Sequence, residues 1–67
     1  MTDDVKQFVW DVYIDAAWQE KPTRMSVADA QYNIDCWKED KVDMPDGLTA
    51  EMFADEWNRI CDADKNI

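Results

Sequence analysis

The sequence predicts a small all-α domain, built as a three-helix bundle. Two segments begin with an N-cap residue and continue with apolar residues at helical spacing, the N-terminal segment has a helical composition, and proline or glycine separates the three segments. The length of 67 residues fits one domain, residues 1–67, and 46% of the residues are hydrophobic. A chain this rich in apolar residues is not a disordered acidic tail.

The first predicted helix lies before Pro22 and has apolar residues on two sides. One side carries Val5, Phe8, Val9, Val12 and Ala16, and the nearly opposite side carries Trp10, Ile14 and Trp18. A narrow acidic strip of Asp4, Asp11 and Asp15 runs between them. A helix of this kind either lies centrally between the other two or contacts something outside the chain.

The same segment also has a strand-like pattern over residues 8–14, because strand-forming residues occupy every second position, Phe8, Trp10, Val12 and Ile14. No later segment has strand character, so such a strand would have to pair with its copy in a second chain. The alternative fold is therefore a strand–helix–helix dimer. The helical composition of residues 16–21 and the stop at Pro22 favour the helix.

The second helix is predicted over residues 26–41. Ser26 is a good N-cap, and Asp29 stands where a capping box places its acidic residue. The apolar stripe consists of Val27, Ala30, Ile34 and Trp37.

The third helix is predicted over residues 49–63, with Thr49 as N-cap and Glu51 in the first turn. Its apolar stripe consists of Phe53, Trp57 and Ile60, joined by Ala50, Ala54 and Cys61. Together the two capped helices predict a buried core of Val27, Ile34, Trp37, Phe53, Trp57 and Ile60.

The loop between these helices does not match a calcium site. Aligning Gly47 with the invariant glycine of an EF-hand loop places apolar residues at three ligand positions, Val42, Met44 and Phe53. Asp43 and Asp46 are better explained as turn residues beside Pro45 and Gly47. We expect no metal and no cofactor.

Charge excludes several function classes. The chain has 16 acidic and 7 basic residues, no histidine and a net charge of −9, of which −7 falls in residues 26–67. Phosphates and anionic lipid heads would be repelled, so direct nucleic-acid or membrane binding is not expected. The sequence lacks histidine, a nucleophile constellation and a glycine-rich phosphate loop, and we predict that it is not an enzyme.

The two cysteines, Cys36 and Cys61, have no zinc-site spacing. The beginning of the sequence, MTDDVKQF, is acidic where a secretory signal would be basic. We therefore expect both thiols to be reduced and the protein to be cytoplasmic, in a bacterial host cell.

Acidic residues recur one helical turn apart with few lysines between them. The predicted partner-binding residues are Asp35 and Glu39 on the second helix, Glu51, Asp55, Asn58 and Asp62 on the third, and Asp11, Asp15, Trp10, Ile14 and Trp18 on the first. Twelve of the 16 acids are aspartate, a poorer helix former than glutamate, so helix stability alone does not explain them. Their spacing of about 6 Å per turn is close to the phosphate spacing of a nucleic-acid strand.

In general style, this small, acidic, glycine-poor chain resembles phage-encoded inhibitors such as anti-restriction and anti-CRISPR proteins and inhibitors of host polymerases or repair enzymes. The resemblance implies a protein that binds one partner and blocks it, and it assigns no individual residues. The spacing of the carboxylates predicts the manner, a decoy that docks acidic helix faces into the basic nucleic-acid groove of the partner. The alternative is an interaction module or homodimer that uses Trp10, Ile14 and Trp18, with charge serving only solubility.

Overall fold

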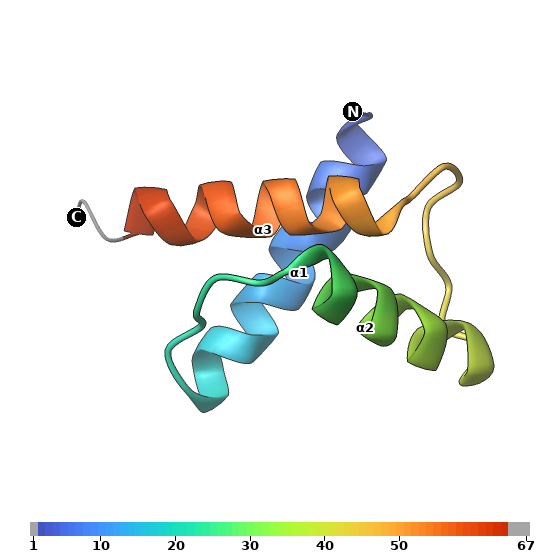
Figure 1. The fold of residues 1–67 in the computed structure, drawn as a ribbon, viewed down its shortest axis with the longest axis horizontal. Coiled ribbons are helices and arrows are strands. Elements are labelled where there is room, and N and C mark those ends of the chain that lie inside the picture. Colours follow the sequence, from blue (N-terminus) through green and yellow to red (C-terminus); the bar gives the residue numbers. More distant parts are fainter. Residues whose placement is uncertain (1, 65–67) are drawn as a thin grey trace.

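The computed structural model describes residues 2–64, which form three helices (Figure 1). Helix α1 spans Asp3–Gln19, α2 spans Val27–Glu39 and α3 spans Ala50–Asp64. No strand occurs within residues 2–64, so the all-α prediction is confirmed. The alternative with a strand at residues 8–14 is wrong, because these residues belong to α1.

The starts of the helices follow the predicted capping chemistry. A hydroxyl oxygen accepts a first-turn backbone N–H at each start: Thr2 from Val5 at 3.4 Å, Ser26 from Asp29 at 3.1 Å, and Thr49 from Met52 at 3.2 Å. These bonds satisfy donors that have no partner inside the helix. The predicted starts of the second and third helices are therefore confirmed to within one residue.

Helix α2 ends at Glu39, two residues before the predicted end. The backbone N–H of Val42 donates to the carbonyl of Trp37 at 2.9 Å, and that of Lys41 donates to Lys38 at 3.2 Å. Lys41 has a φ of 59°, the left-handed conformation that closes a Schellman motif. Glycine usually fills this position, so a lysine gave no sequence signal for the stop.

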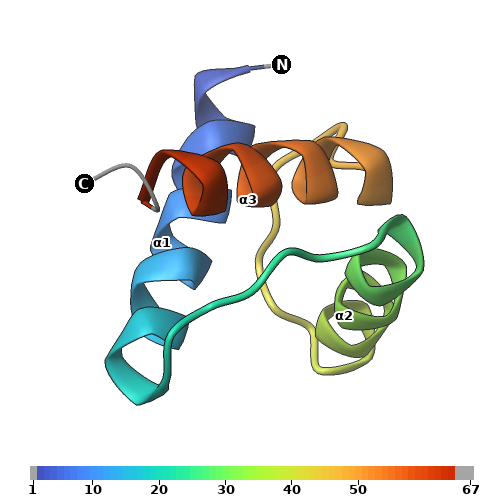
Figure 2. The ribbon, with the colours of Figure 1, turned by 60° about the vertical axis from the view of Figure 1, so that its left-hand side comes forward.

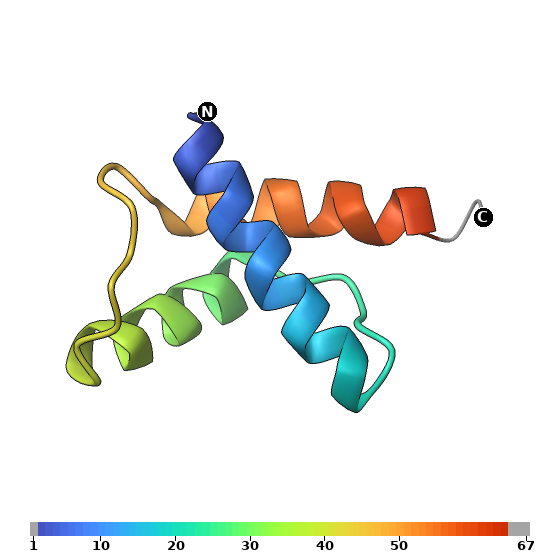
Figure 3. The same ribbon diagram turned by 180° about the vertical axis from the view of Figure 1, so that it is seen from behind.

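Helix α3 is the central element, because both other helices pack against it. α1 crosses α3 on one side (Figure 3), and α2 lies on a neighbouring side (Figure 2). The segment of residues 20–26 runs from the end of α1 across to the start of α2. The central position that the sequence suggested for the first helix therefore belongs to the third, and the second apolar stripe of α1 is left uncovered.

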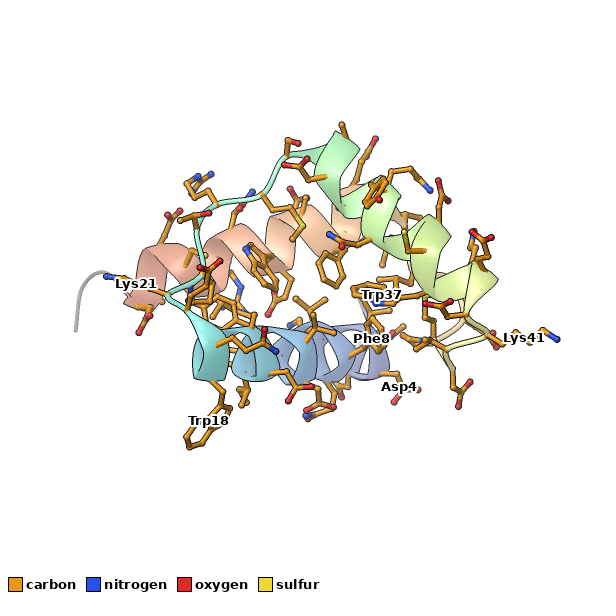
Figure 4. The ribbon with its side chains drawn as sticks, turned by 90° about the horizontal axis from the view of Figure 1, so that it is seen from below. Asp4, Phe8, Trp18, Lys21, Trp37 and Lys41 are labelled. Carbon is orange, nitrogen blue, oxygen red and sulfur yellow. The ribbon has the colours of Figure 1, made fainter. Side chains whose placement is uncertain are left out.

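The buried core confirms most of the predicted set. Ile34, Phe53, Trp57 and Ile60 are buried, and α3 contributes the largest share. Trp37 is half-buried, and its ring packs against Phe8 and Phe53 with centroids 5.5 Å apart in each case. Figure 4 shows Phe8 and Trp37 pointing toward one another between α1 and α2.

The prediction was wrong for Val27, which is 46% exposed. It stands in the first turn of α2, at the rim of the helix pair, while Ala30 and Ile34 make the buried part of that stripe. On α1 the sequence missed Tyr13, which is buried with Val5 and Val9.

None of the three helices is long and apolar enough to cross a membrane.

Candidate partner-binding surfaces

The second stripe of α1 lies at the surface and forms one wall of a groove. Trp10, Ile14 and Trp18 are 40%, 49% and 84% exposed. They line an open groove of about 360 Å³ between α1 and the C-terminal half of α3, together with Tyr13, Ala17, Ile60 and Asp64. In Figure 4, Trp18 points away from the rest of the molecule. An apolar surface of this kind on a small acidic protein is a candidate interaction site.

Trp10 is only partly available to a partner, because its indole forms a hydrogen bond with a buried carboxylate. Its indole Nε1 donates to Oε2 of Glu56 at 3.1 Å, and Glu56 is 3% exposed. Arg59 also binds Glu56, with Nε donating to Oε1 at 2.9 Å and a second nitrogen on Oε2. The hydrogen bonds and charge of Arg59 outweigh the effect of burial and lower the pKa of Glu56.

The buried side chain of Tyr13 also lines the groove. The hydroxyl of Tyr13 donates to Oδ2 of Asp64 at 3.4 Å, and the tyrosine ring packs edge-on against Trp57 at 5.0 Å. Burial, assisted by neighbouring Cys61 and Asp64, raises the pKa of Tyr13 to about 12. Tyr13 is therefore neutral at physiological pH, and the carboxylate of Asp64 is the charged group that lines the groove.

The acidic strip of α1 runs beside this groove. Asp4, Asp11 and Asp15 are all exposed, and Asp11 accepts a hydrogen bond from Nε2 of Gln7 at 2.9 Å. Asp4 and Asp11 also line a second hollow together with Asp43 and Asp46 of the loop after α2. The exposed face of α1 thus combines tryptophan and aspartate side by side.

Two of the predicted acidic residues, Asp35 of α2 and Glu51 of α3, are linked through Gln31. Asp35 accepts a hydrogen bond from Gln31 at 2.8 Å, and Gln31 lines the same hollow as Glu51 at the start of α3. Glu39 and Asp55 are exposed, one turn beyond Asp35 and Glu51 along their helices. Glu51 of α3 therefore lies beside α2 at Gln31, and Asp35, Glu39 and Asp55 are exposed farther along the two helices.

The other two predicted residues of α3 hold the segment that joins α1 to α2. Oδ1 of Asn58 accepts the backbone N–H of Met25 at 2.7 Å, and its Nδ2 donates to the carbonyl of Met25 at 2.9 Å. Asp62 forms an ion pair with Arg24 at 2.5 Å. Asn58 and Asp62 thus lie on the same side of α3 as Glu51 and Asp55. Unlike those two residues, they bind the segment that joins α1 to α2.

Replacing Asn58 with alanine is expected to lower the free energy of unfolding by about 1–3 kcal/mol, because the peptide groups of Met25 lose both partners in a half-buried place. Chemical denaturation measures this loss. The matched control is Asp55→Ala, an exposed position on the same helix side, which should change stability by about 0.5 kcal/mol or less. Equal effects of the two substitutions would contradict the structural role of Asn58.

Metal-binding groups and thiols add no further site. Within residues 2–64, no group of three or more acidic or cysteine side chains is arranged to hold a metal ion. Cys36 is half-buried on α2 and Cys61 is buried on α3, and both are free thiols.

Comparison with known proteins gives no match, neither to a family model nor to a curated protein nor to a solved structure.

Proposed function

We propose that this chain is a non-enzymatic binding protein that occupies the basic nucleic-acid-binding groove of a partner protein, in the manner of a phage-encoded inhibitor acting in the host cytoplasm. The observation that supports it best is the exposure of the four predicted carboxylates Asp35, Glu39, Glu51 and Asp55 on α2 and α3. Gln31, which donates a hydrogen bond to Asp35, lines one hollow with Glu51, so that Glu51 lies beside α2.

The exposure of the carboxylates, and the small number of ion pairs among the described residues, also support the proposal. Fifteen of the 16 acidic side chains are exposed, and Glu56 is the buried one. In the part of the chain that the structure describes, two ion pairs are formed, Arg24 with Asp62 and Arg59 with Glu56. The remaining charge faces water and is available to a cationic partner.

The proposed mechanism is competition with nucleic acid. Helical carboxylates one turn apart, at about 5–6 Å, would take the places of successive phosphates in a groove lined by lysine and arginine. Each buried carboxylate needs a basic partner, because desolvating an unpaired charge is costly. No bond is made or broken, and inhibition follows from occupancy alone.

Affinity capture at two salt concentrations tests the proposal. The immobilised protein is expected to retain nucleic-acid-binding proteins from a bacterial lysate at low salt and to release them at high salt, because screening weakens contacts between exposed charges. A double-stranded oligonucleotide should release the same proteins by competition. Retention that neither salt nor oligonucleotide reduces would refute the decoy mechanism.

Neutralising two exposed carboxylates of α3 should weaken capture of the identified partner. Glu51→Gln combined with Asp55→Asn is expected to reduce affinity by about tenfold or more, since hydrogen bonds to charged groups are worth about 1.5–3 kcal/mol each. Thermal stability should rise slightly as like-charge repulsion is lost. Asp62 is left unchanged because it binds Arg24.

The matched control changes the charge equally at another surface. Asp43→Asn combined with Asp46→Asn neutralises two exposed loop carboxylates beside α1. This variant should bind the partner as the unmodified protein does. If both double variants bind equally well, the carboxylates serve solubility and the proposed function is wrong.

A further inference from the structure

We propose that the groove between α1 and α3 is a docking site for a short amphipathic helix of a partner protein, with apolar anchors flanked by arginine or lysine. This inference goes beyond the proposed function, because it concerns a different side of the molecule. The carboxylates of the proposed decoy surface, Asp35, Glu39, Glu51 and Asp55, do not line the groove. It therefore stands even if those carboxylates serve only solubility.

The spacing of the apolar residues along the groove suits a partner helix. Trp10, Ile14 and Trp18 are spaced at four-residue intervals and extend for about 12 Å along α1, the length of two helical turns. The buried residues Tyr13 and Ile60 also line the groove, and α3 contributes Ile60 and Asp64. A partner helix with apolar side chains at i, i+4 and i+7 would place them along this stripe.

The charge around the groove indicates that the occupant is basic. Asp64 is the charged residue that lines it, and Asp11 and Asp15 run along the neighbouring side of α1. The cations near the other end, Arg59 and Lys6, act on the buried carboxylate of Glu56. Basic residues of the partner therefore fit best beside Asp15 and Asp64.

The exposed indoles add a second attraction for the same residues. Trp18 is 84% exposed and Trp10 is 40% exposed, so that guanidinium groups can reach an aromatic face. Tryptophan is the strongest aromatic partner in cation–π contacts. Arginines flanking the apolar anchors could thus contact both an indole and a carboxylate.

A second copy of the chain fits the groove less well. Residues 3–20 contain five acidic residues and one lysine, so pairing α1 with its own copy would oppose two segments of net charge −4. Three exposed apolar side chains also provide much less than the area of about 1,200–2,000 Å² that stable interfaces bury. A short basic helix needs less area and gains from the charge.

The test uses a synthetic peptide of about 15 residues, with leucines at i, i+4 and i+7 and arginines at flanking positions. Calorimetric titration should give one-to-one binding. Nuclear Overhauser contacts should join the leucine methyl groups to Ile14 and Trp18 of the unmodified protein, a readout that does not depend on any variant folding. A peptide with glutamate in place of each arginine should bind at least about tenfold more weakly.

Variants of the protein complete the experiment. Ile14→Ser combined with Trp18→Ser should weaken binding of the arginine peptide at least about tenfold, the loss typical of removing central anchors. The control Tyr32→Ser removes an aromatic residue on α2 that is 71% exposed and should leave binding unchanged. Glu51→Gln combined with Asp55→Asn should also leave it unchanged, which separates the groove from the decoy surface.

Several outcomes would overturn the inference. They are absence of binding, equal binding of the glutamate peptide, and unchanged binding to the Ile14 and Trp18 double variant. Sedimentation showing a dimer that the peptide dissociates would assign the groove to a second copy instead.

Discussion

Replacing Trp57 with alanine is expected to lower the free energy of unfolding by about 3–5 kcal/mol, the range for removing a large buried aromatic side chain. Trp57 is 6% exposed on the central helix, and its ring lies 5.0 Å from Tyr13 of α1 and 5.9 Å from Phe53. Its indole also donates to the carbonyl of Thr23 at 2.7 Å. One side chain thus joins α1, α3 and the segment before α2.

A loss of this size approaches the whole stability expected for so small a domain. We therefore expect a large fraction of Trp57→Ala to be unfolded at about 25 °C, because the stability of native domains amounts to only about 0.05–0.15 kcal/mol per residue. Far-ultraviolet circular dichroism during thermal melting measures the effect. A melting temperature within a few degrees of the unmodified protein would show that this stripe is not the core.

Trp57→Phe serves as the matched control, because it keeps an aromatic ring and removes the indole donor. The carbonyl of Thr23 would lose its partner, but Thr23 is exposed and water can replace the bond. We expect a loss of about 1–2 kcal/mol, smaller than for alanine. A loss as large as that of alanine would place the main contribution in the hydrogen bond rather than in packing.

The helices could be predicted because their signals are local. Ser26 and Thr49 cap their helices in the way that the sequence indicates, and the stripe of Phe53, Trp57 and Ile60 is buried. The end of α2 was missed because Lys41 adopts a left-handed conformation without being glycine. The sequence also did not show that α3 is the central helix, since periodicity shows which side of a helix is apolar but not which helix covers it.

The candidate surfaces were predicted in part, because helical spacing is also a local signal. Helical spacing placed Trp10, Ile14 and Trp18 on one side of α1, and all three are exposed. Spacing could not show that Asn58 binds Met25 or that Glu56 lies beneath Trp10, because these pairs are 33 and 46 residues apart in sequence. Among so many acidic residues, nothing in the sequence distinguishes Glu56 as the buried one.

Glu56 also connects stability to pH. Replacing it with glutamine is expected to lower the free energy of unfolding by about 1–3 kcal/mol near neutral pH, since Trp10 and Arg59 then donate to a neutral group. Because folding lowers the pKa of Glu56, its contribution is complete above the pKa of the unfolded chain. The contribution is lost as the pH falls through the lower pKa of the folded state.

The difference in stability between the unmodified protein and Glu56→Gln should therefore shrink from about pH 7 to about pH 3, the range in which carboxyl groups titrate. Urea denaturation at a series of pH values measures it. Arg59→Met provides the complementary variant: it removes the largest of the causes that lower the pKa of Glu56, so the fall in stability toward acid pH should become smaller. In the Glu56→Gln background, Arg59→Met should have little further effect, because the ion pair is already gone.

The stability difference between the unmodified protein and Glu56→Gln could instead stay constant from neutral to acid pH. That result would mean that the Glu56 carboxylate is solvated like the other acidic residues, and that the link between Trp10 and α3 does not depend on its charge.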